Sequence, residues 1–272
     1  MPDVATPDPT SLTAYLAQLE GHQLRALFAR DPKSAAMWIR ATAGEGLPAA
    51  QLCYGRMLLE GTGVPKDRAA ALMWFRCAAE GYASDSISPD SIKPDSVKSD
   101  AINMVGRCLD NGWGTAVDAT AAAQQYRRAA DAGHTWAQYN LGHLYLAGRG
   151  VPRDFHIAFS YYQRAAQRGH ERAMNLVGRC HEQGWGTPCD DVLAAAWYRR
   201  SAERGYFRGQ YNWASILLHD GRIDEAAVWF ELAAIGGTDG VRKAVLDVTR
   251  SHASEALQAL AARLQDKTAA AA

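Results

Sequence analysis

A spacing of 36 residues recurs along this chain and constrains its fold more than any other feature. At each step a glycine or alanine follows an apolar residue, and a small residue stands five positions earlier. In the units before the last, a pair of glycines separated by one residue follows, and an aspartate comes four residues after that pair. The first column is Gly106, Gly142, Gly178 and Ala214, and the aspartates are Asp67, Asp118, Asp154 and Asp190. A fixed period of this length predicts tandem structural repeats.

Each unit is best explained as two antiparallel helices, A and B. The small residues allow helix A to approach its neighbours closely, and the glycine pair ends helix A because glycine adopts left-handed backbone conformations. The aspartate is expected to cap helix B. One unit alone cannot bury its apolar face, but a stack of units can. The sequence therefore predicts an all-α fold, an α-solenoid of about five to six antiparallel helix pairs with a C-terminal capping helix.

The repeated units resemble those of the Sel-one-like repeat family, which is related to tetratricopeptide repeats. They read A-x-x-x-[LV]-G-x-x-x-x-x-G-x-G-[VT]-x-x-D, followed by Trp or Tyr and then by A-A-x-x-G. Four units over 48–205 match strongly, and a fifth over 206–237 has the shorter turn DGRIDEA. We expect a flexible tail over 1–10, the solenoid over 11–250 with a degenerate first helix over 11–29, and a capping helix with an Ala-rich tail over 251–272.

An insert of 15 residues, 85–99, interrupts the period as three copies of one pentapeptide, DSISP, DSIKP and DSVKS. Removing it restores the spacing, so it falls between helix B of one unit and helix A of the next. We expect a solvated Ser/Asp/Pro-rich loop over 83–100, because exposed loops tolerate insertions at little cost. Its five-residue aspartate spacing does not suit a calcium loop. A docking or autoinhibitory strap through Ile87, Ile92 and Val97 stays open.

Composition and charge exclude several classes of function. The formal net charge is zero, so no global basic field attracts nucleic acid or an anionic membrane. No apolar run is long enough to span a bilayer, and the first residues lack the pattern of a signal peptide. Five cysteines are an odd and sparse count, which fits a reduced set of thiols. We expect a cytoplasmic protein without a nucleic-acid or membrane partner.

No familiar catalytic or metal-binding motif is present, and we expect no catalytic residue, cofactor or metal. Cys180, His181 and Cys189 could supply zinc ligands. Against this, Cys180 and Cys108 occupy one repeat position that reads as core, where free cysteine packs as a small hydrophobe. Cys53 and Cys77 belong to facing helices, and whether they pair stays open. The resemblance implies that secreted relatives join each repeat by a cysteine pair, and alanines occupy those positions here.

Aromatic residues recur on helix B. They could form a stacking platform for nucleic acid, but their helical spacing beside an alanine pair predicts packing between layers. These residues are Trp74, Tyr126, Tyr162, Trp197 and Trp229.

Helix A is expected to line the concave face of the solenoid. Alternate units present Asn, Arg and an acid, and the units between them present aromatic or aliphatic residues. Asparagine would pair with the backbone of an extended peptide, and arginine would bind its carboxylates. The alternative is a solvated face on which Arg107 pairs with Asp110 and Arg179 with Glu182. The predicted binding residues are Asn103, Arg107, Trp136, Tyr139, His143, Asn175, Arg179, Arg208 and Tyr211.

The sequence favours a non-catalytic scaffold or adaptor that binds a protein or peptide, with acidic groups, in this groove. The resemblance implies adaptor roles in assembling complexes, often bacterial ones. The alternatives are a hydrolase or small-molecule binding protein that acts on cell-wall fragments, and a structural subunit that acts through its edges.

Overall fold

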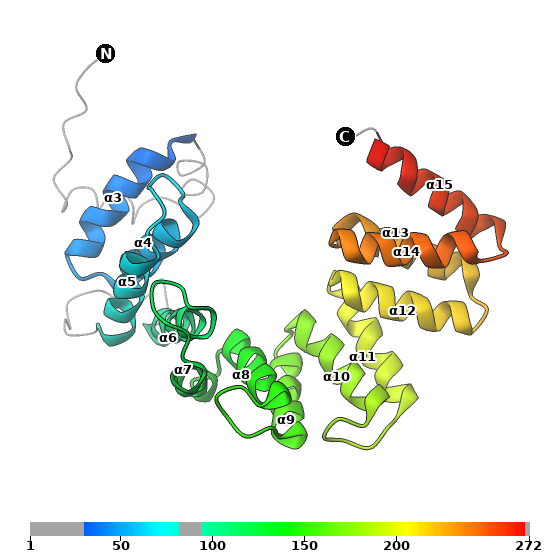
Figure 1. Cartoon of the computed structure of the whole chain (residues 1–272), viewed down its shortest axis with the longest axis horizontal. Helices are drawn as coiled ribbons and strands as arrows, with labels where there is room; N and C mark the ends of the chain where they lie inside the picture. Colours follow the sequence, from blue (N-terminus) through cyan, green and yellow to red (C-terminus); the bar gives the residue numbers. More distant parts are fainter. Residues whose placement is uncertain (1–29, 82–93, 270–272) are drawn as a thin grey trace, which may run out of the picture. The chain divides into compact units, whose positions relative to one another are not determined.

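The computed structural model describes residues 30–81 and 94–269. All regular elements in this part of the chain are α-helices (Figure 1), which confirms the all-α prediction. The predicted tail and first helix, 1–29, lie outside the described residues. The helices are α3 (Pro32–Gly44), α4 (Pro48–Glu60), α5 (Arg68–Glu80), α6 (Pro94–Asn111), α7 (Ala119–Asp131), α8 (Thr135–Ala147), α9 (Phe155–Gln167), α10 (Glu171–Gln183), α11 (Asp191–Glu203), α12 (Phe207–His219), α13 (Ile223–Gly236), α14 (Asp239–Ser251) and α15 (Glu255–Ala269).

The recurring aspartates cap helix B, as predicted. The side chain of Asp67 accepts a hydrogen bond from the backbone N–H of Ala70 at 2.9 Å, which satisfies one of the amides left free at a helix start. Asp118, Asp154 and Asp190 make the same bond at 2.8–2.9 Å. One residue type at one repeat position therefore sets the start of α5, α7, α9 and α11.

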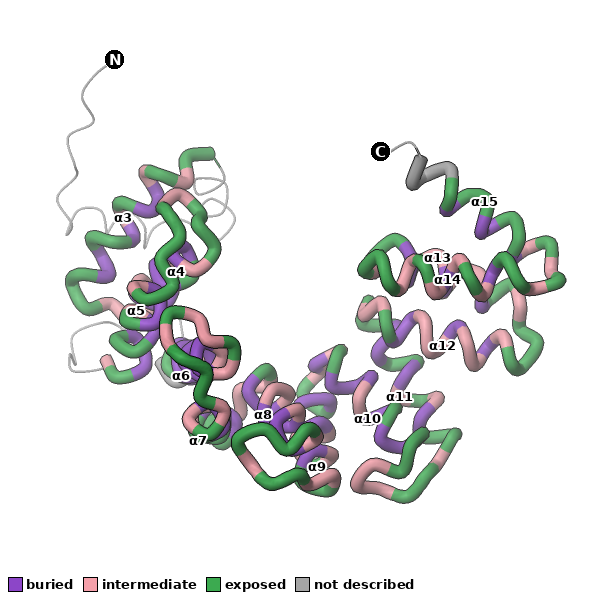
Figure 2. Tube along the Cα trace, in the orientation of Figure 1, coloured by how far each residue is buried: buried purple, intermediate pink, exposed green. Residues whose placement is uncertain are grey.

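The recurring glycine of helix A lies against an aromatic ring of helix B. A Cβ atom at Gly142 would lie 2.6 Å from the Tyr162 ring, and one at Gly178 would lie 2.8 Å from the Tyr198 ring. This contact explains why the position excludes a larger side chain in these units. The rings at this position, Phe75, Tyr126, Tyr162, Tyr198 and Phe230, are buried, and Figure 2 shows such buried positions recurring along the helices.

The predicted set of packing aromatics needs a correction of one residue in three units. Trp74, Trp197 and Trp229 are only half-buried, whereas the residue that follows each of them is buried. Two consecutive aromatic residues differ by about 100° around a helix. Only the second of each pair is therefore buried, and in the first two of these units it lies against the recurring glycine.

The turn between helices A and B requires glycine for two reasons. Gly186 has a φ of +71°, in the left-handed region that other residues rarely adopt. A Cβ atom at Gly186 would also overlap the backbone carbonyl of Phe155, at the start of α9. The turn of one repeat therefore rests against helix B of the preceding repeat.

The predicted loop over 83–100 extends too far. Helix α6 already begins at Pro94, within the third pentapeptide, so residues 94–100 are helical. Proline is favoured in the first turn of a helix, and Val97 and Ser99 are buried there. Residues 85–93 of the insert, with Ile87 and Ile92, lie outside the described residues.

The chain divides into two compact units. The first contains the residues up to Ala137 together with Arg149–Val151, and the second contains Gln138–Gly148 and Pro152 onward. In the second unit, Leu257 and Leu260 of α15 join a buried cluster with Phe230 and Val245. The predicted C-terminal helix thus covers the apolar side of the last helix pairs. Across the described helices, none combines the length and the hydrophobicity needed to traverse a bilayer.

Candidate functional site

The second unit contains an open pocket of about 480 Å³ on its helix-A side. Helices α8, α10 and α12 and the start of α14 provide its wall. Six of the nine predicted binding residues line this pocket: Tyr139, His143, Asn175, Arg179, Arg208 and Tyr211. The phase argument from the sequence therefore selects side chains that the fold of the second unit brings together.

Stacked aromatic rings build one side of the pocket. Tyr139 is stacked on His170 with ring centroids 4.9 Å apart, and it meets His143 edge-on at 4.6 Å. Tyr211 contacts the buried ring of Phe230 at 5.6 Å. Burial raises the pKa of Tyr139, so its hydroxyl stays protonated at neutral pH. These rings are anchored by core residues, and the pocket wall is therefore preorganised.

Two asparagines of the pocket wall contact each other. Asn212 Nδ2 donates a hydrogen bond to Asn175 Oδ1 at 2.9 Å. Asn175 is 7% exposed, so this contact fixes a nearly buried amide. The pair leaves one donor group, Asn175 Nδ2, and one acceptor atom, Asn212 Oδ1, without a hydrogen bond to the described residues. Exchanging the O and N positions of both amides leaves one donor and one acceptor as well.

Arginines on either side of this pair lie over aromatic rings. The Arg179 guanidinium is 4.8 Å from the centroid of the Trp185 ring, and that of Arg208 is 5.9 Å from Phe207. Within the described residues neither arginine forms an ion pair with a carboxylate. The alternative pairing of Arg179 with Glu182 is therefore wrong. Glu182 instead accepts a hydrogen bond from the Tyr198 hydroxyl at 3.0 Å.

The other three predicted residues belong to the first unit. Asn103 is 6% exposed, whereas Trp136 is 40% exposed. Arg107 lies 5.1 Å from the Trp113 ring centroid and donates to Met104 Sδ at 3.5 Å. Its predicted alternative partner, Asp110, pairs with Arg149 at 3.1 Å. Asn103, Arg107 and Trp136 therefore belong to the first unit and are not among the residues that line the pocket of the second.

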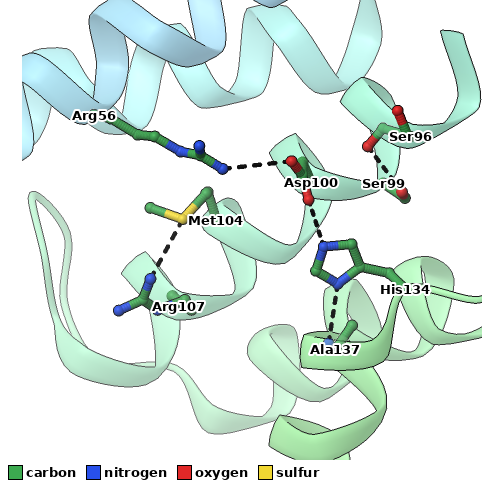
Figure 3. Close-up of polar contacts among 8 residues, drawn as sticks. All are labelled: Arg56, Ser96, Ser99, Asp100, Met104, Arg107, His134 and Ala137. Carbon is green, nitrogen blue, oxygen red and sulfur yellow. Dashed lines mark hydrogen bonds and ion pairs between the residues drawn. The ribbon is translucent and has the colours of Figure 1, made fainter. Parts of the chain in front are cut away.

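Figure 3 shows a polar group in the first unit that the sequence reasoning missed. Asp100 accepts from Arg56 Nη2 at 3.5 Å and from His134 Nε2 at 2.5 Å. The other ring nitrogen of His134 accepts from the backbone N–H of Ala137 at 3.1 Å. Burial opposes ionisation of Asp100, but His134 and Arg56 together hold its pKa below the ordinary value. The 36-residue period is the signal that could have revealed this position.

Cys108 and Cys180 are buried and act as packing residues. Burial raises the pKa of Cys108 to about 11 and that of Cys180 to about 12, which disfavours the reactive thiolate. All five cysteines are free thiols, so Cys53 and Cys77 are not joined. No cluster of three or more potential metal ligands occurs among the residues that the structure describes.

Antiparallel helix pairs, repeated along the chain and closed by a terminal helix, define a helical-repeat protein of the α-solenoid class. The family model described as "Sel1 repeat" matches residues 48–81, 99–134, 137–170, 171–206 and 208–237. These segments cover more than half of the chain, and the protein therefore belongs to the Sel1 repeat family. The gap between the first two segments falls on the insert. Sel1 repeats generally mediate protein–protein interactions, and no catalytic family is indicated.

Solved structures of similar fold come from several bacteria. A Sel1 repeat protein from Oxalobacter formigenes is 24% identical, with a TM-score of 0.74, over 92% of this chain and 99% of that chain. The protein c5321, described as a protective antigen of uropathogenic Escherichia coli with an SLR fold, is 27% identical, with a TM-score of 0.55, over 98% of this chain and 66% of that chain. The immunity protein Pa5087 from Pseudomonas aeruginosa is 15% identical, with a TM-score of 0.50, over 80% of each chain, and shows likeness of fold alone. Among the curated proteins compared, none matches this chain.

Proposed function

We propose that this protein is a non-catalytic scaffold that binds an extended segment of a protein partner in the pocket of its second unit. The observation that carries the proposal is the Asn175–Asn212 pair. A peptide group presents one N–H donor and one C=O acceptor. The unused acceptor and donor of the asparagine pair complement these two groups.

The pocket wall suits the side chains of such a segment. Tyr139, Tyr211 and Val241 offer apolar surface, and Arg179 and Arg208 offer charged donors at the rim. The family supports a protein partner in general terms. An adaptor role in a bacterial cytoplasm is part of the proposal and rests on the sparse cysteines and on the resemblance.

The hydrolase alternative lacks a supporting observation. Its chemistry would need a nucleophile or an acid–base pair with a shifted pKa facing a pocket. In the described part of the second unit, the thiol of Cys180 is buried and its pKa is raised. Glu182, the acid in the pocket wall, is engaged by Tyr198.

The test replaces both members of the pair, Asn175→Ala with Asn212→Ala, and measures capture of partners from the native lysate. Gln167→Ala is the matched control, since Gln167 is exposed on α9 outside this pocket. We expect the double variant to bind its partner roughly ten-fold or more weakly, as for loss of a central interface contact. If the double variant and the Gln167→Ala control capture the partner equally well, the binding site lies outside the pocket.

A further inference from the structure

One position of the repeat is occupied by residues of different charge in successive repeats. The residue six places before the recurring glycine or alanine is Asp100 in α6, Trp136 in α8, Arg172 in α10 and Arg208 in α12. In the first unit the charge of Asp100 is met by Arg56 and His134. In the second unit the arginines face the pocket instead. Only Arg172 has a carboxylate nearby, Glu171 at 4.0 Å.

Arg208 and Arg179 lie on opposite sides of the asparagine pair. Arg208 is one helical turn before Asn212 on α12, and Arg179 is one turn after Asn175 on α10. Because α11 reverses the chain between them, α10 and α12 run in the same direction. Each arginine is therefore displaced by about 6 Å along the helix axis from the pair, in opposite directions. Both line the same pocket.

This arrangement matches the geometry of an extended chain. Successive side chains of an extended peptide point to opposite sides of its backbone. If the asparagine pair holds one peptide group, the two residues joined by that group direct their side chains toward Arg208 and toward Arg179. A planar guanidinium can bind a carboxylate through two parallel hydrogen bonds.

The only acidic side chain in the pocket wall of the described second unit is that of Glu182. It lies two turns beyond Asn175 and one turn beyond Arg179 on α10, and it accepts a hydrogen bond from the Tyr198 hydroxyl. The same wall contains three positively charged residues, Arg172, Arg179 and Arg208. The pocket is therefore complementary to negative charge around the asparagine pair, and it repels a carboxylate near the end of α10.

We propose that the pocket selects an extended peptide with two consecutive acidic residues, whose side-chain carboxylates bind Arg179 and Arg208 while Asn175 and Asn212 hold the peptide group between them. This inference rests on the proposed peptide-binding function. It adds the chemical class of the bound segment and the direction in which its side chains point.

The test measures binding of short acetylated and amidated peptides to the full chain by fluorescence anisotropy. The central pair of the probe is Glu-Glu, Gln-Gln or Lys-Lys in a common Ala/Leu sequence, and an unamidated Gln-Gln peptide supplies a terminal carboxylate alone. A displayed library of random peptides is selected in parallel. The variants are Arg179→Glu and Arg208→Glu, singly and together. Arg200→Glu is the control, because Arg200 also lies over an aromatic ring, 4.8 Å from Trp197, but outside this pocket.

We expect the wild type to prefer Glu-Glu over Gln-Gln by about ten-fold or more, and each pocket variant to lose this preference. The double variant should prefer Lys-Lys, which also shows that it is folded, and Arg200→Glu should behave as wild type. Equal binding of Glu-Glu and Gln-Gln, selected library peptides without acidic pairs, or preference for the terminal carboxylate would each overturn this inference and leave peptide binding standing. If no peptide and no library member binds, the proposed function itself fails.

Discussion

The α8–α9 repeat and the α10–α11 repeat use the same packing but differ in one polar contact. In both repeats a helix-A glycine lies against a buried tyrosine of helix B. The Tyr198 hydroxyl donates to Glu182 at 3.0 Å. The buried hydroxyl of Tyr162 finds no acceptor among the described residues, because Leu146 stands where Glu182 stands one repeat later. The ring is thus required by packing, whereas the partner of its hydroxyl varies from repeat to repeat.

The largest effect should come from breaking the contact that the two repeats share. Gly142→Ala and Gly178→Ala would each place a Cβ atom within 2.6–2.8 Å of a tyrosine ring. We expect each change to lower the free energy of unfolding by about 2–3 kcal/mol, as for overpacking of a core. Urea denaturation followed by circular dichroism measures this.

Gly236 supplies the control for that prediction. It ends α13 without a positive φ, and a Cβ atom there would meet nothing within 4 Å. Gly236→Ala should therefore raise the free energy of unfolding by about 0.5–1 kcal/mol. If Gly142→Ala and Gly178→Ala do not lower the free energy of unfolding relative to Gly236→Ala, the contact between glycine and ring does not limit the packing.

An intermediate effect should separate the two repeats. Tyr198→Phe removes a hydrogen bond to a carboxylate and should cost about 1–2 kcal/mol of unfolding free energy. Tyr162→Phe removes a buried hydroxyl without an acceptor and should be neutral or stabilising by up to about 1 kcal/mol. Urea denaturation of the two variants side by side measures the difference. Equal losses would contradict the contrast between the repeats.

The smallest effect concerns the histidines that precede α8 and α10. His134 and His170 each accept a hydrogen bond from a backbone N–H three residues later, and His134 also binds the carboxylate of Asp100. The pKa of Asp100 is lowered in the folded state, so its ionised form stabilises the fold above the unfolded pKa of about 3.9, and this stability is lost as the pH falls through the folded pKa.

We therefore expect Asp100→Asn to cost a few tenths of a kcal/mol near pH 7, because the carboxylate is partly exposed and screened by solvent. The difference from wild type should shrink as the pH falls through the folded pKa of Asp100, which lies below the ordinary value. Urea denaturation at a series of pH values measures it. A difference that persists unchanged in acid would show that the carboxylate charge contributes nothing.

Repeat spacing predicted the fold well because packing and capping follow fixed positions. The glycine column and the aspartate caps are each defined by one residue type in register with the period. The end of the insert was predicted less well, because α6 already begins at Pro94 and buries Val97. The burial of Val97 depends on residues that are its neighbours in space and not in sequence. Six pocket residues followed from helical phase. The Asn175–Asn212 bond and the Asp100–His134 bond did not, because each joins residues more than thirty positions apart.

The turns of this protein determine where its chain can be lengthened. The turn that holds Gly186 rests on the backbone of α9, so an added residue there would displace a neighbouring helix. The short turn of the fifth repeat is different, since a Cβ atom at Gly221 would meet nothing within 4 Å. We therefore expect the turn at Gly221 to accept a tag or a foreign loop without displacing the repeats on either side.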